Sequence, residues 1–88
     1  MIYRVLVGRP AERSLRRRVP PRRAAQIRQA IDDLAANPRS RGAIKMRGTR
    51  EREEWRVRVG DYRIVYRVDD EAREVIILAV GHRGSVYG

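Results

Sequence analysis

The sequence contains no cysteine and only one histidine, and these two shortages exclude several kinds of chemistry. Without cysteine the chain has no disulfide bridge and no reactive thiol, which fits a reducing cytoplasm. One histidine leaves too few soft ligands for a transition-metal site. The sequence also has no catalytic Ser-His-Asp pattern and no phosphate-cradling glycine loop. We therefore expect neither a metal nor an organic cofactor.

Long apolar stretches are also missing. No run approaches the roughly 18 residues of a membrane-spanning helix, and the first residues, Met1 to Arg4, lack the apolar core of a signal peptide. We therefore expect a cytoplasmic protein with no membrane contact. Hydrophobic residues still make up 42% of the chain, which is enough for a packed core. The length of 88 residues suits one domain spanning residues 1–88.

Positive charge is what the sequence has in excess. The formal net charge is +10, and Lys45 is the only lysine among 21 basic residues. So basic a surface favours polyanionic partners such as nucleic acid, an acidic protein or anionic lipid. The arginine fork holds phosphate through two hydrogen bonds and stacks on bases, although a bias toward arginine codons would give the same composition. Composition therefore favours nucleic-acid binding and specifies no reaction.

The hydrophobic pattern predicts an α+β fold, in which a helical hairpin packs on one twisted sheet. An N-terminal strand is followed by two helices, because Pro20-Pro21 breaks one helix and Asn37-Pro38 stops the next. Three to four antiparallel strands complete the sheet. In chain order we predict a strand over 2–7, helices over 10–18 and from 21 to the Asn37-Pro38 stop, a short strand over 43–47, and strands over 55–59, 62–68 and 75–80.

The loop Gly60-Asp61 fixes the register of the hairpin around it, because a two-residue loop with glycine first is typical of a type II′ turn. Arg58 then faces Arg63, and Glu54 faces Arg67. One face of the hairpin is apolar and should form the core: Trp55, Val57, Val59, Tyr62, Ile64, Tyr66 and Val68. The other face carries four arginines: Arg56, Arg58, Arg63 and Arg67.

Two arginines directly opposite each other suggest an anion site. Opposed like charges destabilise a sheet by some tenths of a kcal/mol, and an anion held between Arg58 and Arg63 would offset that cost. The alternative is a solvated face, whose long aliphatic stems cover apolar surface while the charges spread into water. Because four arginines gather here and Arg83 follows in the next segment, we favour the anion site.

Arginines can support RNA cleavage without acting as bases. They clamp a phosphate and neutralise charge that grows on its oxygens in the transition state. Attack by the 2′-hydroxyl of the RNA then needs alignment and one or two proton-transfer groups. His82 and Tyr87 in the tail are candidates for these groups. A lone surface histidine and an aromatic packed on the sheet edge are their ordinary alternatives.

The residues at 55–68 read WRVRVGDYRIVYRV and are followed by VGHR at 80–83 and VY at 86–87. This pattern resembles the C-terminal half of RelE-type toxins of the RelE/ParE superfamily, which belong to type II toxin–antitoxin pairs. The order of the earlier elements suits the same family, so the resemblance covers effectively the whole chain. It implies a RelE-like fold and a toxin whose partner is an acidic, RelB-like antitoxin encoded beside it, bound in a hetero-oligomer.

The resemblance also implies an activity and a site. RelE-type toxins are metal-independent endoribonucleases that cut mRNA on the ribosome by 2′-hydroxyl attack. The family's active-site positions fall on Arg56, Arg58, Arg63, Arg83 and Tyr87. The usual family pattern has lysines at the first two positions, and their replacement by arginine shifts the expected proton transfer to Tyr87 or His82.

Two other functions remain open at this point. A ParE-type toxin shares the fold, inhibits DNA gyrase and cuts no RNA. A non-enzymatic RNA- or protein-binding module would need only the basic surface, and its binding would weaken steeply with salt without any cleavage.

Overall fold

The computed structural model describes residues 2–48 and 52–82, so the predicted site residues Arg83 and Tyr87 lie outside the described part of the chain. The predicted α+β class is confirmed. The element order is β1 (Arg4–Val7), α1 (Arg9–Arg17), α2 (Pro21–Asp33), β2 (Ile44–Gly48), β3 (Arg52–Val59), β4 (Tyr62–Asp69) and β5 (Glu74–His82).

The five strands form one sheet in the order β1-β5-β4-β3-β2. Strands β2 to β5 pair antiparallel with their neighbours, whereas the N-terminal strand β1 lies parallel to β5. The sheet is therefore mixed and has one strand at each edge, β1 and β2. The short segment predicted at 43–47 is a full member of the sheet, so the strand count reaches the upper end of the expectation.

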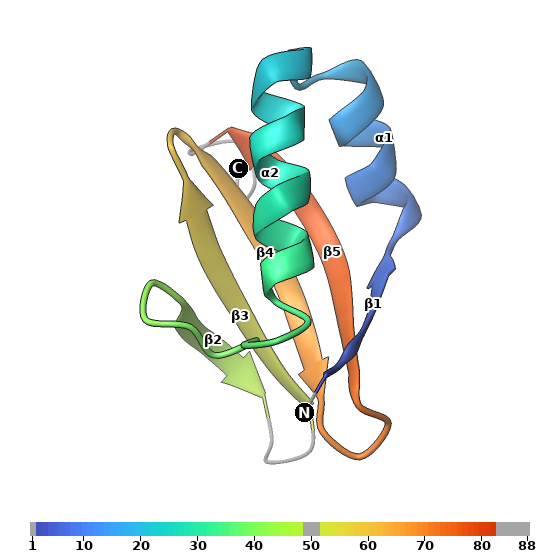
Figure 1. Ribbon diagram of the computed structural model, residues 1–88, viewed down its shortest axis with the longest axis vertical. Helices are drawn as coiled ribbons and strands as arrows, with labels where there is room; N and C mark the ends of the chain where they lie inside the picture. The colour runs from blue at the N-terminus through green and yellow to red at the C-terminus, as the bar shows by residue number, and fades with distance from the viewer. Residues whose placement is uncertain (1, 49–51, 83–88) are drawn as a thin grey trace.

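Both helices lie on the same face of the sheet, and no other described element covers the opposite face (Figure 1). Helix α1 buries Ala11 and Leu15, and α2 buries Ala24, Ile27 and Ile31. These side chains pack against the buried residues of the central strands: Ile64, Tyr66, Val68, Val75, Ile77 and Val80. Each fully buried large aliphatic contributes about 1.5–3 kcal/mol, so this layer supplies most of the hydrophobic stabilisation.

Helix α2 ends earlier than the sequence predicted. The helix stops at Asp33, and the next residues form turns in which Leu34 and Ala35 donate to carbonyls only three residues back, those of Ile31 and Asp32. The turns bring Pro38 into the core, where its carbonyl accepts a 2.6 Å hydrogen bond from the Tyr66 hydroxyl. Burial raises the pKa of Tyr66 to about 12, so this hydroxyl stays protonated and the bond persists at physiological pH.

Arg39, just after these turns, sits at the centre of a polar cluster that joins distant segments. Its guanidinium donates to Asp70 at 2.7 Å and to Glu53 at 2.9 Å, and it lies over the Trp55 ring. The Tyr3 hydroxyl donates to the same Asp70 at 2.6 Å. This Arg39 cluster therefore links the chain before β1, the α2–β2 connection, β3 and the β4–β5 turn.

Candidate active site

The β3–β4 hairpin has the predicted register. Arg58 pairs with Arg63, Val57 with Ile64, and Glu54 with Arg67. Gly60 has a φ of +59° and Asp61 is not left-handed, as a type II′ turn requires. Because side chains alternate across a strand, the arginines share the face that the helices leave uncovered.

Three of these arginines, Arg56, Arg58 and Arg63, form what we call the arginine triad. Within residues 2–48 and 52–82 none of the three makes a hydrogen bond or an ion pair with another side chain. The Nε atom of Arg63 is buried and has no acceptor in this part of the chain. A buried donor without a partner costs about 1–3 kcal/mol, and a bound anion would remove that cost.

The carboxylates nearest to the arginine triad are committed elsewhere. Glu54 binds Arg67 at 3.2 Å, as the register predicted, and binds Arg47 from β2 at 3.2 Å. Glu53 points to the other face, where it meets Arg39 and Lys45. No carboxylate of the described residues therefore neutralises the arginine triad.

Strand β5, which pairs with β4, leaves room beside the arginine triad. Gly81 of β5 is the partner of Arg63 and carries no side chain, and Ala79 is the partner of Val65. Val65 is 6% exposed although no helix covers this face, so its methyl groups form an apolar floor between Arg56 and Ala79. Arg58, Arg63 and Gly81 lie side by side on three neighbouring strands, and we call such a set of paired residues a row. This row offers two cations next to a residue without a side chain, which suits a phosphate.

His82 is not part of this arrangement. It pairs with Tyr62 on the helix-covered face, and the two rings meet edge to face with centroids 5.5 Å apart. The reason is a bulge: Val65 pairs with Ala79 but Tyr66 pairs with Ile77, so Leu78 is an extra residue. If side chains alternated between the two faces without interruption from buried Ile77 onward, His82 would lie on the same face as the arginines. The extra residue shifts the alternation by one position, so His82 lies on the helix-covered face. The structure therefore does not bring His82 together with the arginine triad, and the predicted proton transfer by His82 has no support from this geometry.

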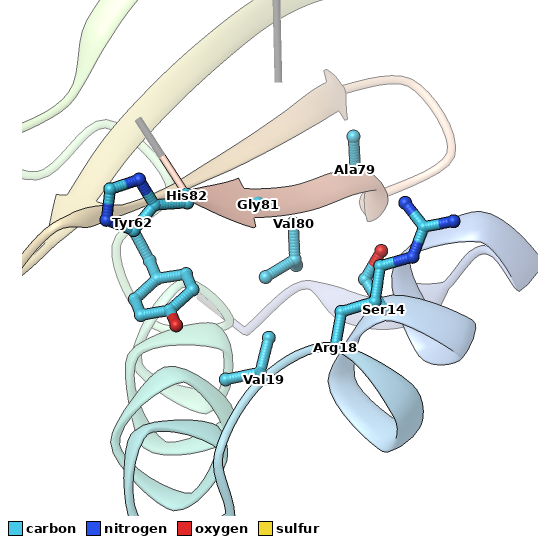
Figure 2. A pocket seen from close by; sticks show the side chains of 8 residues that line it. All are labelled: Ser14, Arg18, Val19, Tyr62, Ala79, Val80, Gly81 and His82. Atoms are coloured by element: carbon cyan, nitrogen blue, oxygen red, sulfur yellow. The ribbon is translucent and has the colours of Figure 1, made fainter. Parts of the chain in front are cut away.

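A groove on the helix-covered face, shown in Figure 2, was not expected from the sequence. It has a volume of about 300 Å³ and lies between the end of α1 and the end of β5. The lining residues are Ser14, Arg18, Val19, Tyr62, Ala79, Val80, Gly81 and His82. The one-turn spacing of Ser14 and Arg18 before the Pro20-Pro21 break is the only signal that could have indicated their proximity.

Two features are absent from residues 2–48 and 52–82. No helix there is long and apolar enough to cross a membrane. No group of three or more acidic or histidine side chains in those ranges is arranged to hold a metal ion.

Known proteins share this fold and much of this sequence. A family model described as the ParE toxin of a type II toxin–antitoxin system, parDE, matches residues 5–87. Toxin RelG of Mycobacterium tuberculosis is 37% identical over 90 residues, which cover 99% of this chain and 98% of that protein.

Two solved structures extend the likeness to three dimensions. The archaeal RelE–RelB complex from Pyrococcus horikoshii aligns with a TM-score of 0.86 at 30% identity, over 97% of this chain and 99% of the other. The toxin–antitoxin complex RelBE2 of M. tuberculosis aligns with a TM-score of 0.78 at 35% identity, over 94% of this chain and 100% of the other. The likeness therefore spans nearly all of each chain.

Proposed function

Because the chain belongs to the RelE/ParE superfamily of type II toxin–antitoxin toxins, we propose that it is a ribosome-dependent endoribonuclease that cleaves mRNA in the cytoplasm. The observation that carries the proposal is the arginine triad. Three adjacent cations lie on an uncovered sheet face, and none has a counterion among the described residues. Such a cluster is suited to a polyanionic chain that supplies the missing negative charge.

The proposed reaction needs no group beyond the RNA and the protein. The 2′-hydroxyl attacks the adjacent phosphorus, the bond from phosphorus to the 5′-oxygen breaks, and the products are a 2′,3′-cyclic phosphate and a 5′-hydroxyl. The arginine triad holds the phosphate in line and neutralises charge on its non-bridging oxygens as the transition state forms. Electrostatic stabilisation of this kind is often the largest single contribution to a rate enhancement.

Two protons must move, one from the 2′-hydroxyl and one to the leaving 5′-oxygen. Arginine does not release a proton in proteins, so the arginine triad does not act as the base. We assign proton transfer to Tyr87 and a fourth phosphate contact to Arg83, the positions that match the family pattern. We assign no proton transfer to His82, because it lies on the opposite face of the sheet from the arginine triad.

The test is to induce the chain in cells and map the ends of translated messages. The proposal predicts new 5′-hydroxyl ends inside coding regions. Arg63→Ala should lower the cleavage rate by about 100-fold, as expected for the loss of one transition-state donor. Arg13→Ala is the matched control, since it removes one exposed charge from α1 in the helix layer and should change the rate no more than a few-fold. Intact messages in cells that contain soluble toxin would refute the proposal.

A second function has its own support, because the matching family model is described as a ParE toxin. In that case the chain would inhibit DNA gyrase and cut no RNA. Induction would then trigger DNA-damage signalling with intact messages, and purified toxin would block supercoiling by gyrase. The same induced cells therefore distinguish the two activities.

We also propose an antitoxin as the binding partner. The relatives from P. horikoshii and M. tuberculosis were solved as complexes with antitoxins. The net charge of +10 on this chain favours an acidic antitoxin, encoded beside it, that folds on binding and forms a hetero-oligomer with the toxin.

A further inference from the structure

The groove at the end of α1 is bounded by an edge of β5 that no strand of residues 2–48 and 52–82 covers. Strand β1 pairs with β5 only from Glu74 to Ile77, and the chain then leaves the sheet to form α1. Beyond Ile77, residues 79–82 of β5 instead form one wall of the groove. The volume of about 300 Å³ is at the lower end of the range for small-molecule sites, so it suits a single nucleotide-sized group.

The two ends of the groove differ in chemistry. Figure 2 shows Tyr62 and His82 at one end, Ser14 and Arg18 at the other, and the Val80 side chain between them. An aromatic pair offers surface for a base, while a guanidinium and a hydroxyl offer hydrogen bonds to a phosphate or a ribose. The buried Val19 and Val80 give the groove an apolar floor against which a flat ring can pack.

The groove is adjacent to the arginine triad, although it opens on the other face of the sheet. Tyr62 directly precedes Arg63 in β4, and the row Tyr62 and His82 is next to the row Arg63 and Gly81. The two sites are therefore one residue apart along β4 and along β5, on either side of an edge that no described strand covers. An RNA strand that follows this edge passes from one site to the other.

We propose that the groove binds one nucleotide next to the phosphate held by the arginine triad. Its base packs against Tyr62 and His82, and its phosphate or sugar contacts Arg18 and Ser14. This inference rests on the proposed function, because it takes the occupant to be the RNA substrate. A peptide strand is the less suitable occupant, because a groove of about 300 Å³ holds little more than one residue-sized group.

The experiment is a binding cycle with short single-stranded RNA, in which one deoxyribose at the scissile position prevents cleavage. One base at a time is removed from the RNA, and affinity is measured by fluorescence anisotropy for the unchanged protein and for His82→Ala and Tyr62→Leu. Removal of the base that occupies the groove should weaken binding by the unchanged protein about 5- to 10-fold. In both variants the same removal should have less than a twofold effect.

Arg18→Ala and Arg17→Ala form the matched pair for the other end of the groove. Both remove one exposed charge from the end of α1, but only Arg18 lines the groove. We expect Arg18→Ala to weaken RNA binding at least threefold more than Arg17→Ala. Equal losses of RNA affinity in the two variants would show that binding depends only on net charge, and would overturn the inference.

Other outcomes separate this inference from the proposed function. A base-removal penalty that is the same in the unchanged protein and in both variants overturns the groove site, even if messages are cleaved in cells. Variants that weaken antitoxin binding and leave RNA binding unchanged also overturn it, in favour of a peptide occupant. A penalty that disappears in the variants supports the groove site even when no message is cleaved, and in that case only the proposed nuclease activity fails.

Discussion

Arg58 illustrates how a residue that lowers stability can be suited to binding an anion. It lies directly opposite Arg63, and no described residue supplies a counterion to either. Each side chain alone is an ordinary exposed or half-exposed arginine of a sheet. The pairing and the buried Nε of Arg63 are the two observations that favour an anion site over a solvated surface.

Arg58→Thr should therefore stabilise the fold while it removes function. Relief of the repulsion should raise the free energy of unfolding by about 0.2–1 kcal/mol, and threonine suits a strand. Urea unfolding with an unchanged m-value measures the gain. Arg67→Thr is the control on the same face, and it should give no gain, because Arg67 is paired with Glu54.

Inorganic phosphate adds a second measurement to this comparison. A ligand that binds only the folded state raises stability by mass action, so phosphate should stabilise the unchanged protein more than Arg58→Thr. An equal effect of phosphate on both proteins would contradict an anion site at the Arg58–Arg63 pair.

At the scale of elements, the Arg39 cluster adds polar links between segments that are far apart in the sequence. A hydrogen bond from Arg39, followed by one from Tyr3, holds the pKa of Asp70 below its usual value. Burial alone would raise the pKa of Glu53, but hydrogen bonds from Arg39 and Trp55 outweigh burial and lower it. Both carboxylates are therefore charged partners in the folded state.

This cluster predicts a loss of stability in acid. A carboxyl with a lowered folded pKa contributes stability above its unfolded pKa, and that contribution disappears as the pH falls through the folded pKa. Asp70→Asn should cost about 1 kcal/mol at pH 7, a modest figure because the Asp70 side chain is 44% exposed and solvent screens it. The difference between the two proteins should start to shrink as the pH falls below the usual aspartate pKa of about 3.9, and should vanish only below the lowered pKa of folded Asp70.

Urea unfolding measured between pH 2 and 7 checks this expectation. Asp61→Asn is the control, because it changes a carboxylate of the exposed β3–β4 turn. If Asp70→Asn followed the same pH profile as the unchanged protein, the Arg39 cluster would not link protonation to folding.

The elements also show where sequence reasoning works and where it stops. The Gly60-Asp61 turn fixed every pair of the β3–β4 hairpin, because local turn geometry sets the register of both strands. The bulge at Leu78 has no such signal, since a run from Val75 to Val80 is apolar on both faces and alternation cannot be followed through it. That one residue decides the face on which His82 lies.

The sequence also did not predict which strands pair when they are far apart in the chain. Alternation identifies β1 as a strand but not its neighbour, so its parallel pairing with β5 came only with the structure. The groove depends on that pairing, because it lies where β1 leaves β5 uncovered. Arg18 therefore appeared in the sequence as one more basic residue among many.

At the scale of the whole molecule, the charge of +10 makes binding to any polyanion favourable, so affinity alone does not identify a site. The basic residues of the helices carry part of this charge, and the arginine triad carries another part on the opposite face. A diffuse basic surface and a phosphate clamp differ in how binding depends on salt. Contacts with phosphates release counterions, and each contact adds to the slope of the logarithm of affinity against the logarithm of salt concentration.

The arginine triad should therefore account for a defined part of that slope. With uncleavable single-stranded RNA, Arg58→Ala and Arg63→Ala should each reduce the slope by about 0.7, the value expected for loss of one phosphate contact. Arg13→Ala removes the same charge from α1 and should shift affinity slightly at all salt concentrations while the slope changes much less. Equal slopes for all three variants would mean that the RNA is bound by the overall positive charge of the protein. That result would contradict an active site at the arginine triad.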